Sequence, residues 1–304
     1  MARKPKALSQ EPAVFEVSST SGDIAFTFIG RGAGAPQSPI GSGASTTTNE
    51  DGSPEIPPHD ADSVDESIRA RAQLIASRLA LRRPTVGIGT HRGSGHLHST
   101  RYRDNSDEID LDRTLEVLSE VPLPEDDDII VRERIIRKRS IILAVDVSGS
   151  MRGERFHTAA ATVGALAGEL RHDYLGVIAF WSDAAVLVRL GDTFKPTQVL
   201  DHLLRIPAQG LTNVSFPLEV AAAELARRAV PDSRVVLLSD CVHNAGRDPR
   251  GAAARLPRVD VMLDASGEKD EQLGREIAAA GRGRFLVIKG FRDVAPALTA
   301  FFER

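Results

Sequence analysis

Residues 141–151 read Ile-Ile-Leu-Ala-Val-Asp-Val-Ser-Gly-Ser-Met, a short apolar run that stops abruptly in a polar turn. The length and β-branched content of the run predict a fully buried strand. Asp146, Ser148 and Ser150 then follow at alternate positions. One carboxylate and two hydroxyls that converge where a strand meets a helix can hold a hard divalent cation. The stretch therefore predicts a central strand with a candidate cation site at its end.

A regular alternation of strands and helices begins at Ser140. The predicted strands are 141–147, 174–181, 184–190, 234–240, 258–264 and 284–288. The predicted helices are 154–172, 197–206, 215–230, 250–256, 268–281 and 292–303. Most of the strands are continuous apolar runs, as a parallel sheet covered on both faces requires. We therefore expect an α/β fold: a doubly wound, mostly parallel, six-stranded, Rossmann-like sheet.

Two local features refine this expectation. The tight loop at 181–184 predicts a hairpin that makes 184–190 an antiparallel edge strand. The helix at 154–172 is apolar around most of its circumference, so it should lie against the sheet centre beside the 141–147 strand.

The chain before this domain is divided by composition. We expect a mostly disordered region over 1–60, an accessory helical and extended segment over 61–138, and the α/β domain over 139–304. Within the first region, residues 14–17 and 24–29 alternate well enough for a short hairpin, or form one apolar patch that docks elsewhere. The accessory segment should hold a helix from a capping box at 63–66 to Pro84.

The rest of the accessory segment is less regular. A loop rich in Gly, Arg and His spans 87–103, and its histidines match no zinc-site spacing, so a flexible basic loop is predicted. Contact with an anion or a partner is the alternative. A second helix should begin at Asp107, and 129–131 should be an edge strand or an extended arm that leads into the core.

Composition excludes several classes of protein. The formal net charge of −4 is too close to balance to favour nucleic acid or a membrane surface. A single cysteine, Cys241, leaves no internal disulfide and fits a reducing compartment. No apolar segment follows the basic N-terminus, and no stretch approaches the roughly 18 apolar residues of a spanning helix. We expect a soluble, cytoplasmic protein.

Two more loops carry oxygen donors at predicted strand ends. Gly210-Leu211-Thr212-Asn213 precedes the helix at 215–230, and Ser239-Asp240 closes an apolar strand. Ligands of open α/β sheets bind at the carboxyl ends of the strands, where the strand order switches. Hard oxygen donors without His or Cys favour Mg²⁺ over Zn²⁺, and Mn²⁺ could substitute.

The order Asp-x-Ser-x-Ser, then a Gly-x-Thr loop, then an apolar strand ending in Asp resembles the von Willebrand factor A (VWA) domain over roughly 139–304. The resemblance implies a metal-ion-dependent adhesion site whose ligands map onto Asp146, Ser148, Ser150, Thr212 and Asp240. It also implies that the ion keeps a position for an Asp or Glu from another protein.

One departure from the family lies beside this site. The family usually has Gly after the last Asp, but here Cys241 follows, and His243 stands two residues later. A thiol nucleophile or an extra metal ligand is one interpretation. The other is a small buried residue and a loop histidine that shape the mouth of the site. Trp181, after the second strand, belongs to the core or lies near the metal.

Within the family, the chain resembles bacterial intracellular VWA proteins paired with MoxR-type AAA+ ATPases, and the VWA part of the magnesium chelatase D subunit. The first hypothesis is a non-catalytic, Mg²⁺-dependent adaptor between a separate AAA+ ATPase and a client in complex remodelling or metalloenzyme maturation. The second is a chelatase-like subunit that assists metal insertion into a cofactor. The third is a metal-assisted or Cys-dependent hydrolase, although no Gly-x-Ser-x-Gly elbow appears.

Overall fold

The computed structural model describes residues 5–6, 8, 11–20, 23–32, 47–48, 54–55, 96–101, 109–120, 128–135, 138–148, 154–169, 173–206, 211–228 and 230–302. The chain forms two compact units: one joins Met1–Pro84 with Arg139–Arg304, and the other is Thr85–Lys138. The helix predicted from residue 63 to Pro84 lies outside the described residues. Within the described residues, no helix is both long enough and apolar enough to span a membrane.

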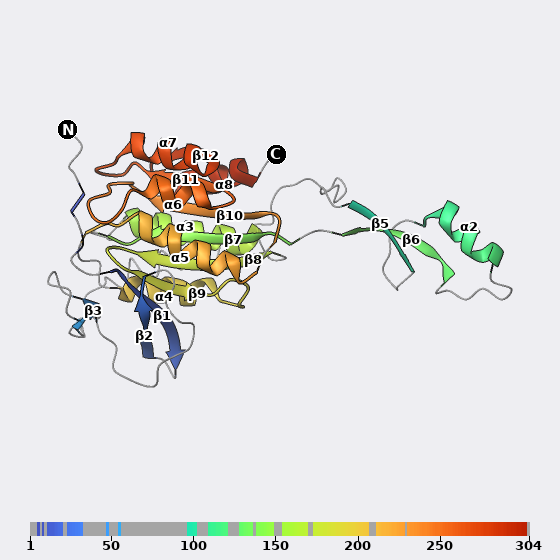
Figure 1. Ribbon diagram of the computed structural model, residues 1–304, viewed down its shortest axis with the longest axis horizontal. Helices are drawn as coiled ribbons and strands as arrows, with labels where there is room; N and C mark the ends of the chain where they lie inside the picture. Colours follow the sequence, from blue (N-terminus) through green and yellow to red (C-terminus); the bar gives the residue numbers. More distant parts are fainter. Residues whose placement is uncertain are drawn as a thin grey trace. The chain divides into compact units, whose positions relative to one another are not determined.

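A mixed sheet of eight strands forms the centre of the larger unit, in the order β12-β11-β10-β7-β8-β9-β1-β2 (Figure 1). Its strands are β1 (Ala13–Thr20), β2 (Asp23–Arg31), β7 (Ser140–Asp146), β8 (Tyr174–Phe180), β9 (Ala184–Val188), β10 (Ser233–Ser239), β11 (Val259–Asp264) and β12 (Arg282–Ile288). The strands from β12 to β8 run parallel, and β9 pairs antiparallel with β8. The doubly wound, mostly parallel architecture expected from the sequence is therefore present.

The predicted number of six strands is wrong, because β1 and β2 extend the sheet to eight. The prediction that 184–190 is an edge strand fails for the same reason. On its far side, β9 pairs in parallel with β1, from Val14 opposite Ala184 to Glu16 opposite Val186. With β1 paired to it, β9 is buried along its whole length. The hairpin of β1 and β2 fills this edge.

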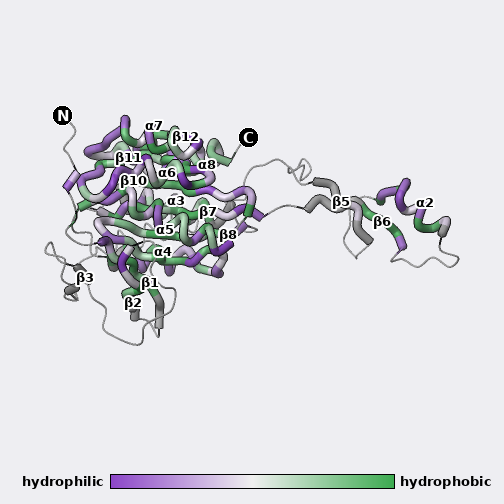
Figure 2. Tube along the Cα trace, in the orientation of Figure 1, coloured by the Kyte–Doolittle hydropathy of each residue, from purple (hydrophilic) through white to green (hydrophobic). Residues whose placement is uncertain are grey.

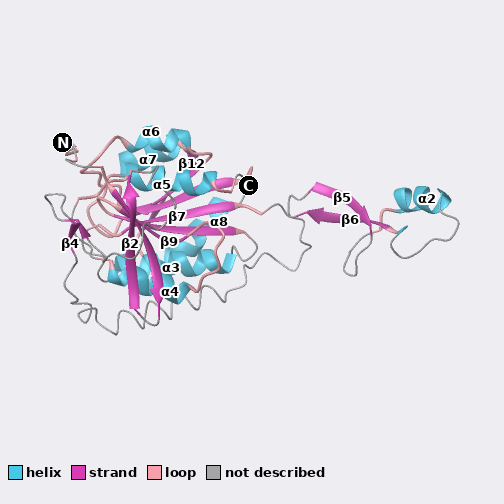
Figure 3. Cartoon of the chain, turned by 60° about the horizontal axis from the view of Figure 1, so that its bottom comes forward, coloured by secondary structure: helices cyan, strands magenta, loops and turns pink. Residues whose placement is uncertain are grey.

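Helices cover both faces of the sheet (Figure 3). One face carries α3 (Glu154–Glu169), α4 (Pro196–Arg205) and α8 (Val294–Phe302), which a 3₁₀ turn at Phe291–Asp293 precedes. The other carries α5 (Ser215–Ala226), α6 (Pro249–Arg255) and α7 (Glu271–Ala280). Hydrophobic segments recur in the strands and in the helices that cover them (Figure 2). Two apolar layers therefore enclose the sheet.

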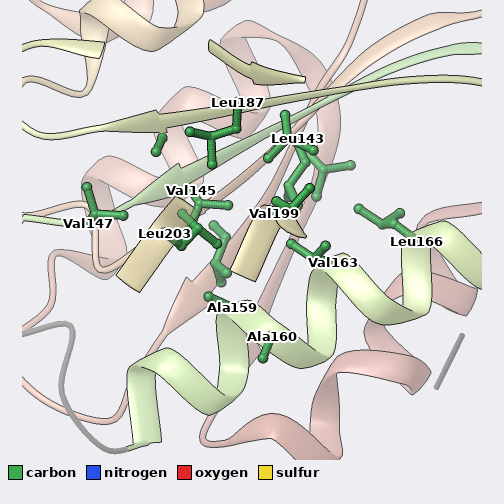
Figure 4. Packing of buried hydrophobic residues seen from close by; sticks show 14 of the residues in the cluster. Leu143, Val145, Val147, Ala159, Ala160, Val163, Leu166, Leu187, Val199 and Leu203 are labelled. Atoms are coloured by element: carbon green, nitrogen blue, oxygen red, sulfur yellow. The ribbon is translucent and has the colours of Figure 1, made fainter. Parts of the chain in front are cut away.

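The strand β7 lies at the centre of both layers. Its residues Leu143 and Val145 face Ala159 and Val163 of α3, and all four are at most 1% exposed (Figure 4). The predicted position of this helix beside the central strand is therefore confirmed. This packing fixes the carboxyl end of β7, where Asp146 stands.

The smaller unit contains β5 (His96–Arg101), β6 (Ile130–Ile135) and α2 (Leu111–Glu120), with β5 and β6 paired antiparallel. Residues 96–101 are therefore a strand and not part of a flexible loop, because β6 supplies a partner far along the chain. The remainder of the 87–103 loop lies outside the described residues. Asp110 caps α2, accepting a hydrogen bond from the Arg113 amide at 3.4 Å. The Thr114 hydroxyl bonds both backbone groups of Ile130.

Candidate metal centre

The candidate site lies at the carboxyl ends of β7 and β10, which are neighbours in the sheet. From β7, the chain continues to β8 on one side and later returns to β10 on the other. Strand order reverses at this point, and such a switch leaves a crevice outside the strand ends in open α/β sheets. The sheet topology thus brings together the loops after β7 and β10 and the turn before α5.

Asp146 accepts hydrogen bonds from two of these loops. Its Oδ1 accepts from the Ser148 backbone N at 3.0 Å and from Ser148 Oγ at 2.5 Å. Its Oδ2 accepts from Ser239 Oγ at 2.5 Å. Thr212 Oγ1 in turn donates to Ser148 Oγ at 2.6 Å. A continuous network of oxygen atoms therefore joins residues that are far apart in the sequence.

Asp240 adds a second carboxylate beside this network. It is 9% exposed, and its Oδ1 accepts from the Val242 amide at 3.0 Å. Asp146, Ser239, Asp240 and Asp264 line one pocket. Burial, and then the negative charge of Asp240, raise the pKa of Asp146 to about 6. The two buried carboxylates repel each other, and a bound cation would relieve this repulsion.

The donor set fits a hard divalent cation. Four of the predicted ligands, namely Asp146, Ser148, Thr212 and Asp240, lie in this network or beside its pocket, and Ser150 lies outside the described residues. No group of three His, Cys, Asp or Glu side chains in the described part of the chain could hold a metal by itself. A metal here would therefore need hydroxyl ligands as well as carboxylates, and oxygen donors of this kind suit Mg²⁺.

Thr212 is positioned by Asn244, a residue that no sequence pattern marks. The Thr212 amide donates to Asn244 Oδ1 at 2.7 Å. The amides of Asn244 and Ala245 donate back to the Thr212 carbonyl at 3.1 and 3.2 Å. Asp264, at the end of β11, was also missed, although its place after an apolar strand matches that of Asp240. An Asn in a loop carries no comparable signal, because only the fold brings it to Thr212.

Cys241 is a buried structural residue in this arrangement. Its side chain is 0% exposed, and its backbone φ is +59°, a conformation that glycine adopts more readily. Burial, together with the charges of Asp146 and Asp240, raises the pKa of the thiol. His243 Nδ1 accepts from the Val214 amide at 3.2 Å, and burial lowers the pKa of this imidazole. The thiol-nucleophile interpretation therefore loses its physical basis, because a reactive cysteine needs an accessible thiolate.

Trp181 belongs to the core. It is 7% exposed and stacks on Phe15 of β1, with ring centroids 6.2 Å apart. Its carbonyl accepts from the Asn213 amide at 2.8 Å. This residue therefore connects the hairpin of β1 and β2 to the turn that carries Thr212.

Comparison with known proteins finds a family model that matches the central part of this unit. Residues 141–243 match the von Willebrand factor type A domain, and this range includes all the predicted ligands. No curated protein matches the chain.

Similar solved structures come from varied proteins. An aerotolerance-related membrane protein from Bacteroides fragilis is 19% identical, with a TM-score of 0.45, and the match covers 54% of this chain and 98% of that one. The SpRpn10 VWA domain is 13% identical, with a TM-score of 0.42, over 54% of this chain and 95% of that one. Proximal thread matrix protein 1 from the mussel byssus, in a structure with a zinc-occupied MIDAS motif, is 19% identical, with a TM-score of 0.40. The match covers 54% of this chain and 47% of that one.

Proposed function

We propose that the larger unit is a non-catalytic protein-interaction module that depends on Mg²⁺. The observation that carries this proposal is the oxygen network of Asp146, Ser148 and Thr212 beside Asp240, at the strand-order switch of the sheet. These residues, with Ser150, would hold the ion. A bound ion supplies a positive charge with room in its shell for an outside oxygen. A carboxylate of a partner protein, from Asp or Glu, is the group that matches this charge.

The hydroxyls at the site favour binding over catalysis. Asp146 lies within hydrogen-bond reach of Ser148 Oγ, as a general base would, but its two oxygens also accept from the Ser148 amide and from Ser239 Oγ. Here Ser148 Oγ donates to Asp146, and Thr212 Oγ1 donates to Ser148. The nearby histidine, His243, uses Nδ1 to accept from the Val214 backbone. The side chains are therefore arranged as ligands.

The partner that we propose is a separate AAA+ ATPase of the MoxR type, with this chain as the adaptor that presents a client protein to it. The family resemblance of the ligand motif supports this choice of partner. Cytoplasmic location and a role in complex remodelling or metalloenzyme maturation belong to the same proposal.

Calorimetric titration with Mg²⁺ and Mn²⁺ tests the ion site. Thr212→Ala should lower Mg²⁺ affinity by about tenfold or more, a loss that removing an outer partner of a metal ligand already reaches. Thr299→Ala is a matched control, because Thr299 is exposed on α8 and its hydroxyl donates to the Ala295 carbonyl of the same helix. Absence of ion binding to the unmodified chain, or equal affinity in both variants, would overturn the proposal.

Affinity capture from cells tests the partner. With Mg²⁺ present, the unmodified chain and Thr299→Ala should retain an ATPase that Thr212→Ala and EDTA-treated protein do not retain. Capture that is unchanged by EDTA and by Thr212→Ala would exclude a partner that binds through the ion.

A further inference from the structure

The start of the chain pairs with the loop that follows Asp240. The Lys6 amide donates to the Asn244 carbonyl at 2.8 Å, and the Gly246 amide donates to the Lys6 carbonyl at 3.1 Å. Lys6 and Ala245 form a parallel bridge. The side chain of Lys6 is exposed, so this contact is made by the backbone.

The same loop positions Thr212 from its other side. Asn244 offers its carbonyl to Lys6, while its side chain accepts from the Thr212 amide at 2.7 Å. The amides of Asn244 and Ala245 both donate to the Thr212 carbonyl. Asn244 and Ala245 therefore lie between the N-terminal segment and Thr212. A shift of the loop away from Thr212 would break contacts on both sides.

Gly246 lets the loop approach this closely. Its φ is +84°, and a Cβ at this position would lie 2.5 Å from Asn213 Oδ1. That oxygen also accepts from the Phe216 amide at 3.3 Å, at the start of α5. Only glycine satisfies both the left-handed conformation and the missing space. The loop backbone thus packs directly on the turn of Thr212 and Asn213.

A second anchor holds the chain a few residues later. The Ala13 amide, at the start of β1, donates to Asp183 Oδ1 at 2.7 Å, and Asp183 follows the end of β8. The chain is therefore fixed after β10 by Lys6 and after β8 by Ala13. Both points lie at the carboxyl edge of the sheet, on either side of β7 in the strand order.

From this geometry we propose that the N-terminal segment, through the backbone of Lys6, acts as a strap. It holds the 241–246 loop against Thr212 and so preorganises the metal ligands. This inference rests on the proposed ion site. It adds that the N-terminal segment controls how tightly that site binds the ion. If the strap is released, the loop is in place for a smaller fraction of the time, and apparent ion affinity falls with that fraction. A partner that binds the N-terminal segment and releases the strap would therefore weaken ion binding.

A pair of substitutions at one position isolates the backbone contact. Lys6→Pro removes the amide that donates to Asn244, because proline has no N–H. Lys6→Ala keeps this amide and removes only the exposed side chain. Deletion of residues 1–10 removes both strap hydrogen bonds and leaves β1 complete. The unfolding midpoint in urea should stay the same in Lys6→Ala and fall only slightly in the other two variants, because the strap lies outside the two apolar layers and contributes only its hydrogen bonds.

The measurements are amide hydrogen exchange at Thr212 and Gly246 without ion, and calorimetric Mg²⁺ affinity. Exchange at Thr212 should accelerate in Lys6→Pro and in the deletion variant. Mg²⁺ affinity should fall about two- to tenfold in Lys6→Pro, as expected for the loss of one hydrogen bond, and at least as much in the deletion variant, which loses two. Lys6→Ala should match the unmodified chain. Equal exchange in all variants, or equal effects of Lys6→Ala and Lys6→Pro, would overturn the strap. Exchange that accelerates while no variant binds Mg²⁺ would keep the strap and overturn only the ion site.

Discussion

Asp183 is the residue at which the fold should show a pH dependence of its own. It is 7% exposed and accepts from the Ala13 amide and from Ser182 Oγ. Burial raises its pKa, although these hydrogen bonds and the charge of Arg31 act in the opposite direction. The folded state therefore binds this proton more tightly than the unfolded chain does. The contribution of Asp183 to stability is greatest at low pH and is lost as the pH rises through the folded pKa.

Asp183→Asn removes this titration and keeps an oxygen for the Ala13 amide. The difference in unfolding free energy between the variant and the unmodified chain should shift in favour of the variant as the pH rises from about 4 towards 7. Urea unfolding at several pH values measures it, with Asp192→Asn in an exposed turn as the control. A difference that stays constant with pH, or shifts the other way, would contradict the expectation.

Among the residues of the candidate site, those that belong to a local sequence pattern could be predicted. Asp146 and Ser148 follow a buried strand directly, and Asp240 follows another, so the sheet topology alone places them together. Asn244 could not be found, because its contact with Thr212 spans 32 residues and depends on a loop conformation. That loop has a left-handed residue at Cys241, a conformation that the glycine usual at this place in the VWA motif would indicate and that a cysteine does not.

Among the elements, β1, β9 and α5 are joined by one arginine. Arg189, just after β9, makes a two-pronged ion pair with Glu16 of β1, with Nη2 2.7 Å from Oε2. Its Nη1 lies 3.2 Å from Glu224 Oε1 of α5, and Glu224 Oε2 accepts from the Leu190 amide at 3.3 Å. The Glu224 side chain is only 8% exposed. Its countercharge comes from Arg189 and from Arg227, whose Nη1 lies 3.6 Å from the same Oε1.

Arg189→Met should destabilise the larger unit by about 1–3 kcal/mol, because the buried Glu224 loses one charged partner and keeps only the longer contact with Arg227. Arg189→Lys should cause a smaller loss of stability than Arg189→Met, since an ammonium keeps the charge but not the planar, two-pronged geometry of the guanidinium. Chemical denaturation followed by circular dichroism measures both. Arg250→Met is the control, because Arg250 pairs with Asp248 and Glu276 on the exposed surface. A loss for Arg189→Met no larger than that of the control would show that Glu224 is satisfied in another way.

The elements themselves were predictable where their patterns are long or continuous. Each strand from β7 to β12 overlaps an expected apolar run, and each helix from α3 to α8 overlaps an expected periodic segment. The parallel pairing of β1 with β9 was not predictable, since it joins residues about 170 positions apart and no local pattern reports it. Alternation in 14–17 and 24–29 indicated a hairpin but not the edge on which it would dock.

For the whole molecule, the docking of the β1–β2 hairpin on β9 means that part of the hydrophobic core comes from the beginning of the chain. Val14, Phe15, Val17 and Ile29 are each at most 9% exposed, and Phe15 packs on both Phe28 and Trp181. Fully burying side chains of this size contributes about 1.5–3 kcal/mol each as an upper estimate. Whole domains are stable by only about 5–15 kcal/mol. The hairpin therefore contributes a large share of the stability of the unit.

Two deletions separate this contribution from that of the smaller unit. Removing residues 1–32 should lower the unfolding free energy by about 5 kcal/mol or more and expose the edge of β9, which should cause association at high protein concentration. Joining residue 84 to residue 139 removes the smaller unit but keeps the hairpin, so the main transition should be preserved. Denaturant unfolding and analytical ultracentrifugation measure the two effects, and a synthetic peptide of residues 11–32 should reverse the first. If the first deletion leaves a monomer of unchanged stability, then β1 and β2 add strands to a sheet that is already complete at β9.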